Sequence, residues 1–476
     1  MKKKKVLPLV LMVILLVVLI VSYFALKNYN SSKEDTTETD SESILSFDYE
    51  NVTEIELKNP TGTYKFEYDL TDSTWKYADD KDFPLDDSQI KSLLGAICSL
   101  NAQRRLEDSL DNISEYGLEN PAYTIKVTGD EGIDYTLNIG DKSSSGNYYA
   151  YIDGTNIVYM IDDTTVSYAG KSLYDMAKVD TVTAITDSDV YELEIDGKTY
   201  SYFEGGNAQY DYTVSNNWFE KLDDGSYKAL DTTQMSSIIS GITGMSYASC
   251  VNYKPSDEEL IQYGLDDEHA KKVVVRYYVT VADETESETE SETETESESE
   301  TETEEIKEPH EVTYWFGAKT DDGNYYIRSS ESSTVNTVSS ETAEKIIAVD
   351  EKTLISKNVF AINSGNVTAL SVTIGGKTYD IVQNGNVTDS DKYEDIYSKI
   401  GEISADSVIT DAGEIKEVSP EMTLSYTLNS ESFPNVKMEF TKYNGSYYQA
   451  TINGNTELLV VKSVIDDIIT KLQATE

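Results

Sequence analysis

Histidine and cysteine, which carry much of nucleophilic and metal chemistry, are nearly absent from this chain of 476 residues. The two histidines, His269 and His310, belong to no H-E-x-x-H pattern, which argues against a histidine-based zinc site. No G-x-S-x-G elbow accompanies them, as a Ser-His-Asp hydrolase would need. We therefore predict no catalytic, cofactor-binding or metal-binding residue and no enzyme, with an undetected hydrolase as the alternative. Cys98 and Cys250 are expected to be buried thiols, and a disulfide between them is the alternative.

Positive charge is also scarce. Lys and Arg number 38 against 87 Asp and Glu, which gives a formal net charge of −49. Nucleic acid is excluded as a partner, because binding it requires Lys and Arg to neutralise phosphates. Part of the negative charge lies in residues 283–305, where Glu alternates with Ser and Thr. Like charges at this density predict a disordered insertion, with weak binding of divalent cations or glycosylation of its Ser and Thr hydroxyls as alternatives.

One long apolar run is present, near the start of the chain. Val6 to Leu26 is uncharged over 21 residues and follows Lys2 to Lys5. At about 1.5 Å per residue it can cross a hydrocarbon layer of about 30 Å. A cleaved signal peptide is the alternative, although its apolar region is usually only about 7–15 residues long. The lysines favour a cytoplasmic amino end. Residues 1–27 are therefore predicted to be a single-pass cell-membrane anchor, followed by a solvated stalk over 28–43 and an extracytoplasmic body.

An amphipathic pattern occurs three times in that body. Apolar residues recur at the i, i+3, i+4, i+7 spacing of a helix that lays one face on a core. The three stripes are Ile90, Leu93, Leu94, Ile97 and Leu100, then Met235, Ile238, Ile239, Ile242 and Met245, then Tyr393, Ile396, Tyr397, Ile400 and Ile403. Asp86, Asp231 and Asp389 precede them as N-caps, and the first two have Gln three residues later, in capping-box form.

Alternating apolar residues around these helices predict antiparallel strands. In the first copy they form hairpins over 52–68, 123–139 and 149–161, and a short helical segment over 171–176 closes the copy. We expect an α+β chain of three related units, each an antiparallel sheet with one main helix, over residues 44–180, 181–362 and 363–476. A Tyr-Gly-Leu corner recurs at 116–118 and 263–265, and a Gly-Asn/Ser-Tyr-Tyr motif recurs at 146–149, 323–326 and 445–448.

The spacing of these motifs places the acidic tract. From the first stripe residue to the Gly of the later motif there are 56 residues in the first unit (90 to 146) and 52 in the third (393 to 445). The second unit has 88 (235 to 323). The surplus of about thirty matches residues 283–305, so the tract is predicted to be an insertion at the tip of a hairpin formed by residues 273–281 and 312–316.

These motifs resemble an uncharacterised family, the domain of unknown function numbered 4340. The resemblance rests on the following residues: Val52 to Leu57, Trp75, Phe83-Pro84-Leu85, Tyr116 to Pro121, and Ile139 to Lys142 followed by Gly146 to Tyr149. It covers residues 44–180 best and weakens beyond 350. The family offers no catalytic residues. Some of its members lie beside ABC-type export components, including those of gliding-motility systems, which implies an accessory role in a membrane complex as one option.

Together these observations predict a membrane-anchored extracytoplasmic repeat protein with a non-enzymatic binding or scaffold role at the bacterial cell envelope. One alternative is an accessory subunit of an ABC-type transporter or a gliding-type membrane complex, with a transporter or envelope protein as partner. The other is a carbohydrate-binding protein, because the chain has 36 tyrosines and a tyrosine ring can stack on a sugar.

Overall fold

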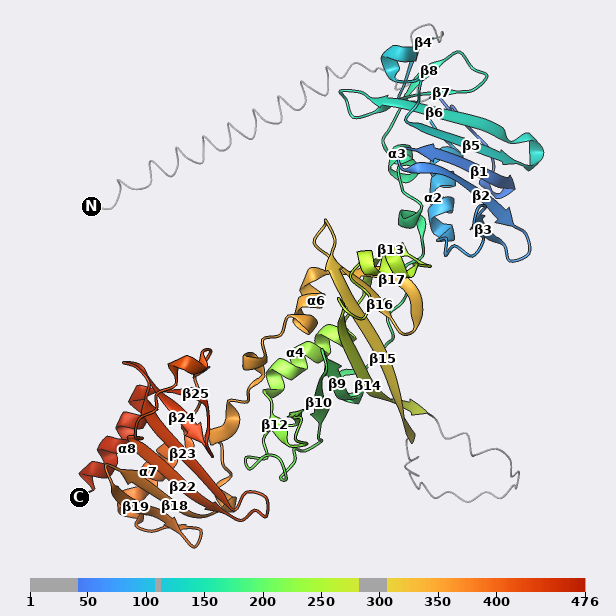
Figure 1. Cartoon of the computed structure of the whole chain (residues 1–476). Coiled ribbons are helices and arrows are strands. Elements are labelled where there is room, and N and C mark those ends of the chain that lie inside the picture. The colour runs from blue at the N-terminus through green and yellow to red at the C-terminus, as the bar shows by residue number, and fades with distance from the viewer. Residues whose placement is uncertain (1–41, 108–112, 282–305, 476) are drawn as a thin grey trace, which may run out of the picture. The chain divides into compact units, whose positions relative to one another are not determined.

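The computed structural model describes residues 42–107, 113–281 and 306–475 (Figure 1). The chain divides between Lys178 and Val179 into two compact units. The predicted anchor over residues 1–27, all but the end of the predicted stalk and the acidic tract lie outside the described residues. Within the described ranges, no helix is both long enough and apolar enough to span a membrane.

The first unit contains one antiparallel sheet of eight strands in the order β3-β2-β1-β5-β6-β7-β8-β4. Strand β1 lies inside the sheet, with β2 on one side and β5 on the other. The chain reaches one edge at β3 and resumes at the opposite edge with β4, after helix α2. The strands are β1 (Val52–Asn59), β2 (Gly62–Asp69), β3 (Thr74–Tyr77), β4 (Arg104–Glu107), β5 (Tyr123–Gly129), β6 (Asp134–Lys142), β7 (Tyr148–Ile152) and β8 (Val158–Ile161).

The second unit contains two further antiparallel sheets, which repeat that strand order. The second sheet runs β12-β11-β10-β9-β14-β15-β16-β17-β13, and β12 is an added edge strand. Its strands are β9 (Val190–Ile195), β10 (Lys198–Tyr202), β11 (Trp218–Lys221), β12 (Tyr227–Ala229), β13 (Tyr247–Asn252), β14 (Lys271–Val281), β15 (Ile306–Lys319), β16 (Tyr325–Ser329) and β17 (Ser332–Val338). Residues Val281 and Ile306 pair at the open end of β14 and β15, so the acidic tract does connect two hairpin strands.

The third sheet runs β20-β19-β18-β22-β23-β24-β25-β21. Its strands are β18 (Val367–Ile374), β19 (Lys377–Gln383), β20 (Asn386–Val387), β21 (Ser407–Val408), β22 (Met422–Leu428), β23 (Asn435–Lys442), β24 (Tyr447–Ile452) and β25 (Asn455–Val461). The prediction of an α+β chain with three antiparallel sheets is thereby confirmed.

Two helices pack together beside each sheet (Figure 1). The predicted main helices are α2 (Asp87–Ile97), α4 (Thr232–Thr243) and α7 (Ser390–Gly401). Their partners are α3 (Thr164–Ala169), α6 (Ser340–Ile347) and α8 (Lys462–Ala474), and a further short helix, α5 (Asp257–Gln262), follows β13. The sequence pattern misses α3 and α6, which are too short to show a clear period. It does predict α8, through the stripe of Val461, Val464, Ile465, Ile468 and Leu472. The closing segment near 171–176 is a 3-10 turn over Tyr174–Met176.

The three helical stripes occupy equivalent places in three separate cores. Leu93, Ile238 and Ile396 are 1%, 2% and 2% exposed, and each belongs to the core of its own sheet. Burying one such side chain contributes about 1.5–3 kcal/mol. Leu100, Met245 and Ile403 lie beyond the helix ends and are also buried, so these side chains extend each core past the last turn.

Asp86 and Asp231 are N-caps as predicted, but their hydrogen bonds differ from those of a capping box. The Asp86 carboxylate accepts from the backbone N–H of Ser88, and the Gln89 side chain donates to that same carboxylate. Although burial raises the pKa of Asp86, these hydrogen bonds bring it below its usual value. Asp231 accepts from the N–H of Gln234, whereas Asp389 makes no side-chain cap hydrogen bond.

Candidate functional site

The repeated Tyr-Gly-Leu corner is a packing device in the first unit. Gly117 takes φ +67°, a left-handed conformation that suits glycine. The corner lies so close to β6 that a Cβ on Gly140 would come within 2.2 Å of the Tyr116 carbonyl oxygen. The Tyr116 ring packs on Tyr149 with centroids 4.8 Å apart, and Leu118 is buried. The motif therefore fastens a loop to the sheet.

The second sheet repeats the device with the same dimensions. Gly264 takes φ +66°, and a Cβ on Gly317 would lie 2.3 Å from the Tyr263 carbonyl oxygen. The Tyr263 and Tyr326 rings are again 4.8 Å apart. In the third sheet Thr441 follows Phe440 in β23, in the place of that glycine, and residues 363–476 contain no Tyr-Gly-Leu sequence. The glycine is thus present in the two sheets that have the corner, where a larger residue would clash with it.

The two histidines do not lie together in one group of metal-binding side chains within the described ranges. His269 lies with Asp266 and Glu268 in the only group of three potential metal ligands among the described residues, and His269 and Glu268 are exposed. His310 packs against Tyr277, with ring centroids 5.9 Å apart. The hydrogen bond that the His269 ring donates to the Asp266 carboxylate raises the pKa of His269, as a surface ion pair would.

Both cysteines are free thiols. Cys250 is buried as predicted, and burial raises its pKa to about 11. The expectation of a buried thiol was wrong for Cys98. This residue is the C-cap of α2, where the helix ends and the side chain is half-buried.

The second sheet also differs from the first in the loop that precedes β11. Residues 203–217 join β10 to β11 with fifteen residues, whereas residues 70–73 join β2 to β3 with four. Aromatic side chains pack the long loop onto the sheet edge: Tyr210 stacks on Tyr227 at 4.3 Å, and Phe203 contacts Phe219 at 5.5 Å. The long loop is therefore packed against the sheet as part of the fold.

A buried carboxylate organises the inside of this loop. Asp211 is 4% exposed and accepts hydrogen bonds from the backbone N–H groups of Thr213, Ser215 and Asn216, at 2.9–3.2 Å. The Asn216 side-chain amide donates to it as well, at 2.8 Å. The Asn216 side-chain oxygen accepts from the Ser356 hydroxyl, which ties the loop to the segment that leads into the third sheet. Asp211 thus has its acceptor capacity filled by the loop.

The loop also reaches the third sheet. The Tyr212 ring packs edge-on against Phe433 at 5.6 Å, and its hydroxyl donates to the carbonyl of Val359 at 2.7 Å. At the tip, Val214 has φ +54° and is 41% exposed. A β-branched residue at positive φ is a strained outlier, and such strain is held only where the surrounding structure enforces it.

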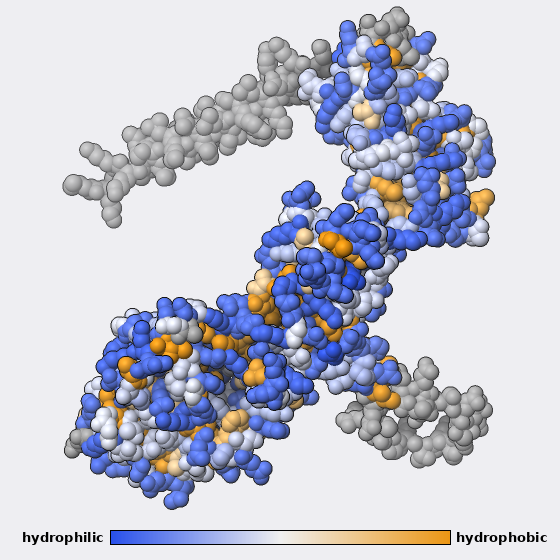
Figure 2. Space-filling model, viewed as in Figure 1, coloured by the Kyte–Doolittle hydropathy of each residue, from blue (hydrophilic) through white to orange (hydrophobic). Residues whose placement is uncertain are grey.

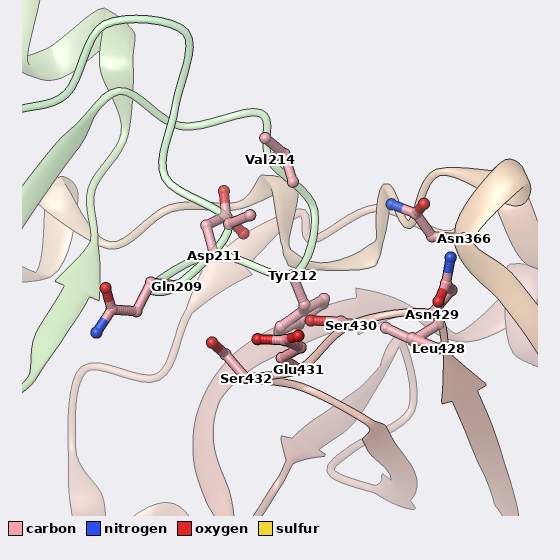
Figure 3. Close-up of a pocket in the computed structure, with 11 residues that line it drawn as sticks. Gln209, Asp211, Tyr212, Val214, Asn366, Leu428, Asn429, Ser430, Glu431 and Ser432 are labelled. Carbon is pink, nitrogen blue, oxygen red and sulfur yellow. The ribbon is translucent and has the colours of Figure 1, made fainter.

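A hollow of about 590 Å³ lies between this loop and the turn that joins β22 to β23 (Figure 3). Its lining is mostly polar and contains no Lys or Arg: Ala208, Gln209, Asp211, Tyr212, Val214, Asn366, Leu428, Asn429, Ser430, Glu431 and Ser432. In Figure 3 Gln209 lies on one side of Tyr212, and Asn366 and Asn429 lie on the other. This hollow is the candidate site.

No sequence pattern predicted a residue of this hollow. The available signal was the length of residues 203–217, because Trp75 and Trp218 are equivalent and the chain before Trp218 is longer by the size of the loop. The other wall comes from residues 428–432, more than two hundred positions later. No local pattern indicates that these two stretches meet.

A comparison with protein-family models decides the family. The model described as a domain of unknown function, DUF4340, matches residues 75–266 and again residues 218–421. The chain belongs to this family. The two DUF4340 matches begin at Trp75 and Trp218, the equivalent tryptophans of β3 and β11, so the family model itself detects the repeat. No curated protein and no solved structure matches the chain.

Proposed function

We propose that this DUF4340 protein is a membrane-anchored, extracytoplasmic binding or scaffold protein of the bacterial cell envelope. The proposed location is supported by the uncharged run from Val6 to Leu26, which follows four lysines. The role is supported chiefly by one observation: the same fold occurs three times, and in the second copy a loop of fifteen residues over 203–217 lines a polar hollow. Variation in loops on a constant scaffold is how many folds acquire binding functions.

The described surface offers mainly polar groups to a binding partner. Most of the described surface in Figure 2 is hydrophilic, and apolar residues are scattered over it. The most exposed large apolar side chains, Leu70, Val418 and Ile261, lie far apart in the sequence. Scattered apolar residues are ordinary on soluble domains, so we expect partners to be recognised through hydrogen bonds and shape.

A site-specific crosslinking experiment tests both parts of the proposal. A photo-reactive amino acid is placed at Gln209, in the hollow, and in a matched strain at Gln262, an exposed position on α5. In native membranes we expect adducts from position 209 and few from position 262. Deletion of Val6 to Leu26 should move the chain to the soluble fraction and abolish the adducts. Recovery of the full chain from the soluble fraction without adducts would contradict the proposal.

A further inference from the structure

We propose that the hollow between residues 208–214 and 428–432 binds a short neutral segment of a glycan. This inference rests on the proposed binding role and names the ligand class for its site. It follows from the charge of the lining, from the hydrogen-bonding groups there and from the elements that form the walls.

The charge of the lining excludes anionic ligands. The hollow has two carboxylates, Asp211 and Glu431, and no cationic side chain. The Asp211 carboxylate is occupied by the N–H and hydroxyl groups of its own loop. A phosphate or a uronic acid would therefore meet one free carboxylate and no counter-charge, in a protein of net charge −49. A neutral ligand meets no such repulsion.

The remaining lining groups match hydroxyl chemistry. Gln209, Asn366 and Asn429 each offer a carbonyl oxygen and an NH₂ group, so each can accept and donate. Glu431 can accept from two hydroxyls. Within the described part of the chain, the side chains of Gln209, Asn429 and Glu431 have no hydrogen-bond partner, so this capacity is available to a ligand. Sugar hydroxyls both donate and accept, and they fit a mixed set of this kind.

The size and walls of the hollow favour a glycan over a peptide. About 590 Å³ lies within the range of about 300–1,000 Å³ typical of ligand sites. Extended peptides commonly bind by adding a strand to a sheet edge. These walls are instead a loop and a turn, which offer isolated side chains and no open strand edge. Tyr212 supplies an aromatic surface on the lining.

The test is isothermal titration calorimetry with the full chain in lipid nanodiscs, since detergents with sugar head groups would compete. The probes are chitotriose, cellotriose and maltotriose. We expect at least one trisaccharide to bind, and the double variant Gln209→Ala/Asn429→Ala to weaken it at least tenfold. The matched variant Gln262→Ala, on the exposed end of α5, should leave affinity unchanged. Thermal unfolding of each variant shows whether the fold is retained.

Two results would overturn the inference: no heat with any of the three trisaccharides, or binding that the double variant does not weaken. Crosslinking of an envelope protein from position 209 without trisaccharide binding would overturn the glycan assignment and leave the proposed scaffold role standing. Trisaccharide binding by a chain recovered only from the soluble fraction would support the glycan assignment and contradict the proposed membrane anchor.

Discussion

The close approach at Gly140 makes a sharp prediction, because a single methyl group should break the Tyr-Gly-Leu corner of the first unit. Gly140 is not at positive φ, so alanine is permitted there by the backbone itself. The obstacle is space: the new Cβ would lie 2.2 Å from the Tyr116 carbonyl oxygen and 2.9 Å from the Gly117 carbonyl carbon. Both atoms are backbone, so the corner must move by about 1 Å to reach ordinary van der Waals contact.

The expected cost follows from what that movement disturbs. Overpacking a well-packed site costs about 1–3 kcal/mol. Loss of the Tyr116–Tyr149 ring contact adds about 0.5–1.5 kcal/mol. We therefore expect Gly140→Ala to lower the free energy of unfolding of the first unit by about 2–4 kcal/mol.

Urea unfolding followed by the fluorescence of Trp75 measures this, since Trp75 is the one tryptophan of residues 1–178. The measurement uses the full chain with Trp218→Phe and Trp315→Phe as a common background. The control is Gly95→Ala in α2, where an added Cβ meets nothing within 4 Å. The control should stabilise the unit by up to about 1 kcal/mol, because alanine favours helix. Equal stability of Gly140→Ala and its parent would refute the packing argument.

Three further predictions concern single side chains. Asp86→Ala should cost about 1 kcal/mol of stability and Asp389→Ala less than half of that, because Asp86 caps its helix and Asp389 does not; equal costs in urea unfolding would contradict this. Since the folded pKa of Asp86 is lowered, the contribution of Asp86 to stability should be present above pH 4 and fade as pH falls through that lowered value. At pH 8 iodoacetamide should modify Cys98 quickly and Cys250 only on unfolding, because the pKa of about 11 leaves only about 0.1% of Cys250 as thiolate. Equal labelling of the two cysteines in mass spectrometry would contradict this. Tyr212→Phe should destabilise the second unit by about 1 kcal/mol in thermal unfolding through its lost hydroxyl hydrogen bond, and an unchanged midpoint would show that bond to be unimportant.

The helices were predictable from the sequence because their signal is local and repeated. The stripe through Leu93 has the same spacing as those through Ile238 and Ile396, and all three side chains are buried in their own cores. The partner helices were harder to predict. Helix α3 has only six residues, and α6 buries only Ala343 and Ile346, which is too few positions to establish a helical period. Only α8 is long enough to show a stripe.

The strand order and the candidate site could not be predicted, because both depend on distant pairs. Strand β1 pairs with β5, some seventy residues away, and nothing in Val52–Asn59 indicates that partner. Likewise, Gln209 and Asn429 share a hollow only because Tyr212 fastens its loop to the third sheet. The length of residues 203–217 was the single local sign of the site, and length alone does not specify what a loop contacts.

Protease treatment of intact cells tests whether an anchored chain carries the three sheets outside the membrane. The strain carries an epitope tag before Lys2 and a second tag after Glu476. We expect the second tag to be lost while the first remains protected on a membrane-bound fragment that contains Val6 to Leu26. Retention of both tags until the cells are lysed, with cleavage immediately afterwards, would contradict it.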